Sequence, residues 1–494
     1  MSSSVADPTG GVLQLTAPQA LLSVRNNDAL VADGISRIAG ETLVSGFKHS
    51  LVTVVSAALA ARAPVRIDNC PDIAETEVLA EIVRRLGGRA DRTGGSLTVD
   101  ADGLHTAELP ADAAAIHGSV YLLPALLSRF GRASVAATGG CRIGDDPGGQ
   151  RPVEQYVGVL ERFGAQAAVL ADGGLRVTAD KLLGCEIDLL DHTADRALRT
   201  GPHYSGATKM AVLTAAVAEG VSILRNPYPK PDVTDLVDVL RKSGTDVTVR
   251  ADGALVIAGR GGRGLDRPAR HVLVPDLIEV VTWVCAGTLL GAGPLTVRGT
   301  GMRRAVTALA PELEVFDRLG VDLSLGPGAD RGADRSDGGD VLTVRPAQRL
   351  RPVDVTVASH GVFSDSQPFL ALLAALADGP STITETVWSG RFGYAPGLAA
   401  LGVQLRQDGR TLTVDGPSAP SRPAPPVHAP DLRAAAALLL AALAVPGPTV
   451  VTGTHHLRRG YPDLPAALRR LGARVRPADL TDLTGPVQNG DARA

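Results

Sequence analysis

The chain has 494 residues, 45 % of them apolar, and its 49 Lys and Arg residues nearly balance its 52 Asp and Glu residues, which leaves a net charge of -3. This length predicts two domains or one repeat array, and the apolar content excludes general disorder. Because there is no basic excess and only 3 % of the residues are aromatic, the composition argues against nucleic acid as a partner.

The sequence contains no stretch typical of export or of membrane insertion. Residues 1–20 lack the basic start and the apolar core of a signal peptide, and we expect them to be disordered, as we do residues 478–494. The longest apolar run, 434–445, has 12 residues and is too short to span a bilayer. We therefore expect a soluble, cytoplasmic protein without a membrane partner.

The four cysteines do not have the spacing of a metal site or of a disulfide framework. Cys70, Cys141, Cys185 and Cys285 contain no CxxC pair among them. We therefore expect no metal and no cofactor. Cys141 differs from the other three because it lies in a glycine-rich polar stretch beside Arg142, a setting that can lower the pKa of a thiol. The other three are typical of buried, small apolar residues.

A short phrase recurs six times along the chain: a charged helix end, an apolar residue, a glycine and then a β-rich stretch. The spacing between successive copies is 70 to 82 residues. A glycine fits the left-handed position just past the end of a helix, so each copy predicts a helix stop followed by a strand. The six glycines are Gly87, Gly164, Gly244, Gly320, Gly402 and Gly472.

A second series of six apolar stretches runs in phase with the first, and each is followed by a short β-rich segment. A helix that is apolar all round must be buried. Each unit therefore predicts a buried helix, a strand, an amphipathic helix, a glycine stop and a strand pair. Six such units predict an α/β protein with two domains of three units and a ligand site between them. The apolar stretches are residues 50–61, 120–128, 210–218, 280–290, 369–377 and 434–445.

Six further motifs occur in one order along the chain: SGFKHS (45–50), GGCRIG (139–144) with RPVEQY (151–156), SDSQPF (364–369), ETVWSGRFGY (385–394), APDLRA (429–434) and HHLRRGY (455–461). With the six units they resemble the enolpyruvyl transferase family, and within it the UDP-N-acetylglucosamine 1-carboxyvinyltransferases, over residues 21–477. The resemblance implies a two-domain α/β fold, an inside-out α/β barrel of six βαβαββ repeats with three repeats per domain. Residues 48–274 would form an inserted domain, and residues 21–47 plus 275–477 an outer domain.

The family reaction adds an acceptor hydroxyl to C2 of phosphoenolpyruvate, protonates C3 and then eliminates phosphate. Such a site needs several cations, ideally planar Arg forks, together with one acid and one base. The resemblance implies that Lys48, Arg151, Arg391 and Arg459 bind phosphoenolpyruvate, and that Lys48 and Arg459 also take part in catalysis. Arg458 is adjacent to Arg459, and the Gly-Tyr pair that follows favours Arg459.

The resemblance also implies the acid and the base. Cys141 would lie on a mobile lid and serve proton transfer, although the loop carries extra residues before Arg151. Asp365, which taken alone would be a helix N-cap, would accept the proton of the acceptor hydroxyl. Asp431 and Arg433 match supporting positions near the reacting centre, where we expect an ion pair. Glu385 is interpreted as a strand-end charge.

The acceptor substrate is predicted from the positions where the sequence matches the motifs of the family and from those where it departs from them. Arg151, Pro152 and Val153 match the turn that holds uracil in the family, which implies a uridine nucleotide. His49 replaces an Asn that touches the sugar, His117 replaces an Arg, and Tyr204, Ser205 and Gly206 stand where a Ser-Val-Gly phrase meets the diphosphate. We expect His49, His117 and the Tyr204–Gly206 phrase to contact the nucleotide.

These departures favour a smaller acceptor, the ribose hydroxyl of UMP, as in relatives from peptidyl-nucleoside antibiotic pathways. The alternative is UDP-N-acetylglucosamine in peptidoglycan synthesis. A third reading is an inactive relative that only binds nucleotide. The expected partners are therefore phosphoenolpyruvate and a uridine nucleotide, and the sequence leaves the oligomeric state open.

If Cys141 is the lid cysteine, fosfomycin should inactivate the enzyme and add its mass to this residue, because the family thiol is the alkylated group. Peptide mass spectrometry would locate the adduct. Phosphoenolpyruvate and nucleotide together should protect Cys141. Labelling of Cys70, Cys185 or Cys285 in its place would contradict the assignment.

Overall fold

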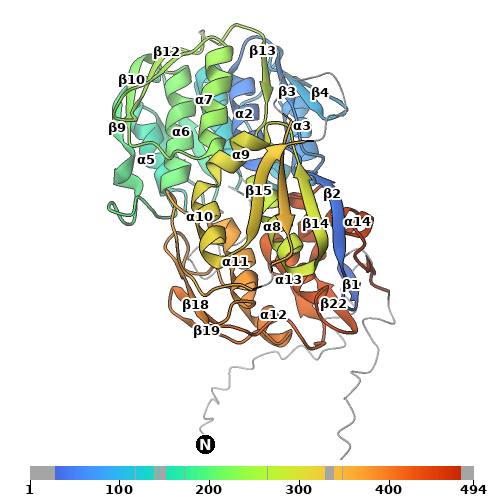
Figure 1. The fold of residues 1–494 in the computed structure, drawn as a ribbon. Coiled ribbons are helices and arrows are strands. Elements are labelled where there is room, and N and C mark those ends of the chain that lie inside the picture. The colour runs from blue at the N-terminus through green and yellow to red at the C-terminus, as the bar shows by residue number, and fades with distance from the viewer. Residues whose placement is uncertain are drawn as a thin grey trace, which may run out of the picture.

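Six small β-sheets carry the repeat units in a computed structural model of the chain (Figure 1). The structure describes residues 28–479 apart from 117, 138, 140–142, 144–151, 172, 264, 329–338 and 348. Within these residues, five sheets have four strands and one has three. Each four-stranded sheet has one parallel pair at an edge and antiparallel pairs elsewhere. The recurring sheet order confirms the predicted repetition of an α/β unit.

Three sheets are formed by the middle part of the chain and three by its two outer parts. The middle sheets are β13 (Ala269–Val272), β3 (Val65–Asp68), β5 (Ser96–Asp100) and β4 (Arg89–Thr93); β6 (Arg132–Val135), β8 (Leu175–Thr178) and β7 (Gln166–Val169); and β11 (Asp246–Val249), β12 (Leu255–Arg260), β10 (Glu219–Arg225) and β9 (Glu186–Asp188). The outer sheets are β15 (Asp322–Pro327), β16 (Asp340–Arg345), β14 (Gly291–Arg298) and β2 (Ile38–Leu43); β17 (Asp354–Val357), β18 (Pro380–Glu385), β20 (Thr411–Asp415) and β19 (Leu405–Asp408); and β21 (Val427–His428), β22 (Pro448–Thr452), β1 (Ala29–Asp33) and β23 (Val475–Pro477).

The six apolar stretches form buried helices, as predicted. The helix α8 buries 13 of its 14 residues, which its sequence requires because it has no polar face. The six are α2 (Lys48–Ala60), α4 (Leu123–Phe130), α6 (Tyr204–Val217), α8 (Leu277–Leu290), α11 (Gln367–Ala374) and α13 (Leu432–Ala442).

The six predicted glycine stops are confirmed. All six glycines have a positive φ, between 86° and 111°, a conformation in which a Cβ is strained. Each follows the outer helix of its unit. These helices are α3 (Ala74–Arg85), α5 (Glu154–Arg162), α7 (Pro231–Lys242), α10 (Ala310–Leu319, preceded by α9, Met302–Ala308), α12 (Ala395–Ala400) and α14 (Leu464–Arg470).

The buried apolar side chains fall into two large clusters. The first core uses residues between 51 and 273, and the second uses residues 30–47 together with 274–475. Figure 1 shows β1 and β2, at the start of the chain, beside β22 and β14 of the second core, while α2 and β3 already belong to the other half. The division into an inserted and an outer domain stays a prediction, and the two cores support it.

Two absences hold for the residues that the structure describes. None of their helices combines the length and the apolar character that crossing a bilayer requires. No cluster of three or more His, Cys, Asp or Glu side chains among them has the arrangement of a metal site.

Replacing Gly87 by Ala should destabilise the fold by about 2–4 kcal/mol, from the strained φ and from overpacking. At φ +102° a Cβ there would lie 2.1 Å from Nδ1 of His105 and 2.4 Å from the carbonyl oxygen of Gly103. Gly253 has φ +83° with no atom within 4 Å of its Cβ position, so Gly253→Ala should cost only about 1 kcal/mol. Chemical denaturation of both variants measures the difference, and equal losses would contradict the steric argument.

Candidate active site

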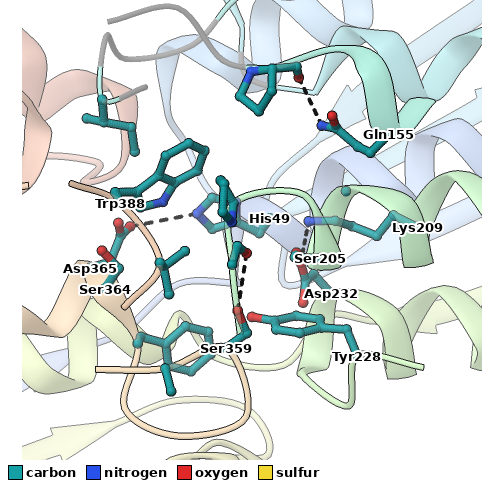
Figure 2. Close-up of a pocket in the computed structure, with 18 of the residues that line it drawn as sticks. His49, Gln155, Ser205, Lys209, Tyr228, Asp232, Ser359, Ser364, Asp365 and Trp388 are labelled. Atoms are coloured by element: carbon teal, nitrogen blue, oxygen red, sulfur yellow. Dashed lines mark hydrogen bonds and ion pairs between the residues drawn. The ribbon is translucent and has the colours of Figure 1, made fainter. Parts of the chain in front are cut away.

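A cleft between the two cores collects side chains from both of them (Figure 2). We call it the central cleft. Its empty space, counted together with the open solvent at its mouth, is about 890 Å³. Helices α2 and α6 supply one wall, and the segments before and after β18 supply the other. Residues that line it include His49, Ser205 and Lys209 on one side and Ser359, Asp365 and Trp388 on the other.

Asp365 lies in this cleft between two arginines. Its Oδ1 accepts a hydrogen bond from Nη2 of Arg391 at 2.8 Å, and its Oδ2 accepts one from Nε of Arg433 at 3.0 Å. Nε2 of His49 is 3.9 Å from the same Oδ2. Burial would raise the pKa of Asp365, but the charge of Arg433, together with His49 and the charge of Arg391, holds it well below its usual range. The group is therefore a carboxylate at neutral pH, the form that accepts a proton.

Asp365 is not the cap of the helix that follows it. The N-cap of α11 is Ser366, and no side chain caps this helix. Asp365 lies in the short 3-10 turn Ser364–Ser366 just before α11. Its two oxygens are occupied by guanidinium groups, so the simple capping interpretation of this residue is wrong.

The two arginines extend a chain of alternating charges away from the cleft. Nη1 of Arg391 donates to Oδ2 of Asp431 at 2.9 Å, and Nη1 of Arg433 donates to the hydroxyl of Tyr461 at 3.2 Å. Oδ1 of Asp431 accepts the main-chain N–H groups of Arg433 and Ala434 and so caps α13. The expected ion pair between Asp431 and Arg433 is thus corrected: Asp431 pairs with Arg391, and the Arg433 guanidinium pairs with Asp365.

Lys48 and Arg459 come together through an acid that the sequence analysis did not single out. Nζ of Lys48, which is 5 % exposed, donates to Oε1 of Glu75 at 3.3 Å and to the carbonyl of Arg459 at 3.2 Å. Nη2 of Arg459 donates to the same Oε1 at 3.2 Å. Glu75 lies in the first turn of α3, where an acid is normally explained by the helix dipole. Only its contacts with Lys48 and Arg459, which are distant in the sequence, distinguish Glu75 from an ordinary acid at the start of a helix.

Besides His49, four predicted nucleotide residues are described at the wall of the central cleft or beside it. Pro152, Ser205 and Gly206 line the cleft, and Val153 is buried at the start of α5. A Cβ on Gly206 would lie 3.0 Å from the ring of Tyr156. The start of α6 therefore packs directly against α5.

Tyr204 faces away from the central cleft. Its side chain is fully buried, and its hydroxyl donates to the carbonyl of Asn226 at 2.8 Å. Because that hydrogen is used, Nε2–H of His360 donates to the hydroxyl oxygen, also at 2.8 Å. Ser205 and Gly206 line the central cleft, whereas Tyr204 is not among its lining residues. The prediction that Tyr204 contacts the nucleotide is therefore corrected.

Three predicted residues, Cys141, Arg151 and His117, lie outside the residues that the structure describes. Their roles stay predictions. Of the other cysteines, Cys70 and Cys285 are buried, as predicted, whereas Cys185 is partly exposed. Burial raises the pKa of Cys70 to about 12 and raises that of Cys285 further.

The segment that leads to Asp365 is attached to the first core. We call residues 358–364 the base loop. The main-chain N–H of Ser359 donates to Oγ1 of Thr200 at 3.0 Å, and the ring of His360 stacks on Tyr204 with centroids 5.5 Å apart. Nζ of Lys230 donates to the carbonyl of Gly361 at 2.6 Å. The geometry of the base loop therefore depends on the first core.

Two buried acids hold the other side of the base loop. Oε1 of Glu312 accepts the N–H of Phe363 at 2.6 Å and the hydroxyl of Ser366 at 3.0 Å. Oε2 of Glu385 accepts the hydroxyl of Ser364 at 2.7 Å, and its Oε1 accepts two further main-chain N–H groups. Burial raises the pKa of both acids. Glu385 is the last residue of β18, at the strand end where the sequence placed it, but it is fully buried among these donors.

Comparison with known proteins places this arrangement among enzymes. A model of the family described as EPSP synthase (3-phosphoshikimate 1-carboxyvinyltransferase) matches residues 32–468. The chain is 33 % identical to a UDP-N-acetylglucosamine 1-carboxyvinyltransferase of Caldanaerobacter subterraneus subsp. tengcongensis and 36 % identical to one of Anaeromyxobacter dehalogenans. Each alignment covers 91 % of this chain and 99 % of the relative.

Solved structures with a similar fold are also enolpyruvyl transferases. The enolpyruvyl transferase NikO from Streptomyces tendae superposes with a TM-score of 0.84 at 50 % identity, over 91 % of this chain and 99 % of that one. An EPSP synthase from Acinetobacter baumannii superposes with a TM-score of 0.65 at 19 % identity, over 92 % of this chain and 100 % of that one, which shows likeness of fold alone. The predicted α/β fold of the enolpyruvyl transferase type is confirmed.

The imidazole of His360 should make stability depend on pH. Burial and the charge of Arg199 lower its pKa from 6.5 to about 4, so the unfolded chain binds this proton first as the pH falls. The folded state therefore loses stability between about pH 6.5 and 4. In His360→Gln the amide can still donate to Tyr204, and the loss of unfolding free energy over this window should be smaller by about 1 kcal/mol, after allowance for partial exposure. Denaturant titrations at several pH values measure it, and identical pH profiles would refute the assignment.

Proposed function

The chain belongs to the EPSP synthase family of enolpyruvyl transferases, and from this premise we propose that its acceptor is a ribose hydroxyl of UMP, as part of nucleoside antibiotic biosynthesis. Its reaction is the transfer of the enolpyruvyl group of phosphoenolpyruvate to a hydroxyl with release of phosphate. The proposal concerns which hydroxyl-bearing nucleotide enters the central cleft and which side chains act on it.

Phosphoenolpyruvate binds, in this proposal, where the two cationic groups of the site meet. Lys48 and Arg151 take its phosphate, and Arg391 and Arg459 take its carboxylate through planar forks. Support comes from the contact of Lys48 and Arg459 through Glu75, and from the position of Arg391 beside Asp365. The substrate anions then compete with Glu75 and Asp365 for the same cations.

Asp365 is the proposed base, and the competition for Arg391 sets its strength. A carboxylate whose pKa is held far down is a weak proton acceptor. When Arg391 turns toward the carboxylate of phosphoenolpyruvate, Asp365 shares one of the charges that hold its pKa low. Its basicity therefore rises only once phosphoenolpyruvate is bound, which couples deprotonation of the acceptor to the presence of the donor substrate.

The chemical steps balance with these groups. The acceptor oxygen forms a bond to C2 while its proton passes to Asp365, and an acid, proposed to be Cys141, protonates C3. Loss of a C3 proton and cleavage of the C2–O bond to phosphate then restore the double bond and release phosphate. The buried guanidinium of Arg433, which is 1 % exposed, keeps Asp365 oriented throughout.

The observation that carries the choice of UMP is the position of His49. Its ring packs on Phe47 with centroids 5.1 Å apart and points at Asp365, and Figure 2 shows it between Asp365 and the wall formed by Ser205 and Lys209. An imidazole at this point narrows the approach to the base, which favours a ribose over an added amino sugar. The first turn of α6 contains no acid, so its N-terminus suits the single phosphate of UMP.

A second candidate is UDP-N-acetylglucosamine. The relatives named above as its carboxyvinyltransferases favour it. Those relatives share 33 % and 36 % identity with the chain, whereas NikO, described only as an enolpyruvyl transferase, shares 50 %.

Phosphate release from phosphoenolpyruvate should be faster with UMP than with UDP or UDP-N-acetylglucosamine, by about tenfold or more in kcat/KM, because a mismatched contact costs about 1.4 kcal/mol or more. Parallel assays with product mass determination measure this preference. Faster turnover of UDP-N-acetylglucosamine would return the protein to peptidoglycan synthesis.

Asp365→Asn serves as the control for this assay. Loss of the base should lower kcat by about a hundredfold or more for every acceptor. Phosphate release that survives in the variant is then not enolpyruvyl transfer and is subtracted from all three measurements.

A further inference from the structure

A buried ion pair forms part of the wall of the central cleft. Nζ of Lys209 lies 2.8 Å from Oδ2 of Asp232, and both side chains are 5 % exposed. Lys209 is one helical turn after Ser205 on α6 and is the only charged residue of that helix. Asp232 lies in the first turn of α7. Figure 2 shows the pair on the side of the cleft opposite Asp365.

Stability alone is a poor explanation for such a pair. The attraction between two buried charges does little more than offset the free energy lost when both are removed from water. Well-packed apolar side chains in their place often give a protein of equal stability. The pair also leaves hydrogen-bonding capacity unused. An ammonium has three donors, yet within the described part of the chain Lys209 makes one hydrogen bond, to Asp232, and Oδ1 of Asp232 has no partner.

The unused hydrogen-bonding groups are a donor, the ammonium of Lys209, and beside it an acceptor, Oδ1 of Asp232. A phosphate does not match it, because an anion would face the unpartnered carboxylate oxygen of Asp232. A uracil edge does match it, since an N3–H donor lies between two carbonyl acceptors. In that arrangement the carboxylate accepts N3–H and the ammonium donates to a carbonyl oxygen.

Aromatic rings beside the pair favour a flat ligand. Nζ of Lys209 lies 5.2 Å from the centroid of the Tyr121 ring, and the rings of Tyr121 and Tyr156 pack edge to face at 5.8 Å. Both tyrosines line the central cleft, and Tyr156 adjoins Gly206. Aromatic faces suit a nucleobase better than a ribose. The pair also lies on the side of the predicted uracil turn, because α5 packs against α6.

We propose that Lys209 and Asp232, with the rings of Tyr121 and Tyr156, read the imide edge of the uracil in the acceptor nucleotide. The inference rests on the proposed function only in requiring a uridine nucleotide. It makes Lys209 and Asp232 determinants of base specificity, because a buried polar site rejects an analogue that leaves its groups unpaired.

Binding of uridine nucleotides methylated at N3 tests the proposal, because the methyl group removes the donor and meets the carboxylate. Calorimetric titration of the full-length enzyme should give a dissociation constant for N3-methyl-UMP about a hundredfold above that for UMP. Equal affinities would overturn the proposal. A loss of affinity seen with 2′-deoxy-UMP and not with N3-methyl-UMP would assign the pair to the ribose and would overturn it as well.

The double variant Lys209→Met with Asp232→Leu separates recognition from folding. It removes both charges together, so no unpaired buried ion remains and the protein should keep its melting temperature within a few degrees. UMP should then bind about tenfold or more weakly, and the ratio between UMP and N3-methyl-UMP should fall towards one. A purely structural pair would leave that ratio unchanged. Lys181→Met with Glu219→Leu, an exposed pair at 3.1 Å on the same half of the molecule, is the matched control and should keep the native ratio.

The two proposals fail separately. UMP and UDP-N-acetylglucosamine both carry uracil, so the N3-methyl comparison is made with whichever nucleotide the native enzyme turns over. Turnover of UDP-N-acetylglucosamine with an N3-methyl effect would contradict the acceptor assignment and support the reading of the base. Turnover of UMP without an N3-methyl effect would support the acceptor assignment and contradict the proposal that Lys209 and Asp232 recognise the base.

Discussion

The carboxylate of Asp365, held between the buried guanidinium groups of Arg391 and Arg433, is the interaction on which the site depends. Charges at this depth persist only when each has a counter-charge, so the surrounding residues alternate in sign out to Asp431. The arrangement keeps the carboxylate of Asp365 ionised. In the proposed function, binding of phosphoenolpyruvate draws Arg391 away from Asp365 and so raises the basicity of this carboxylate.

This centre can form only where the two cores meet. The base loop belongs by sequence to the second core, yet Thr200, Tyr204 and Lys230 of the first core hold it by hydrogen bonds. Lys48 and Arg459, which lie on different cores, share the carboxylate of Glu75. The relative position of the cores therefore determines where Asp365, Lys48 and Arg459 lie with respect to one another.

The two walls of the central cleft divide the work of recognition. In the proposed function, the wall with Asp365 holds the reacting groups, and His49 lies beside this carboxylate. The opposite wall presents the start of α6 together with Lys209 and Asp232, groups suited to a phosphate and to the edge of a base.

The sequence by itself determined what local patterns encode. The glycine spacing predicted six units, the apolar stretches predicted six buried helices, and the ordered motifs predicted the family and the side chains around Asp365; all three rest on short-range spacing. Only the tertiary structure decided which distant residues the buried acids contact. Glu75, Glu385 and Asp232 resemble ordinary helix-start or strand-end acids in sequence, and only burial beside distant residues distinguishes them. Which way Tyr204 faces was likewise decided by packing between the cores, because a local motif does not specify which face of a helix meets a segment some 150 residues away.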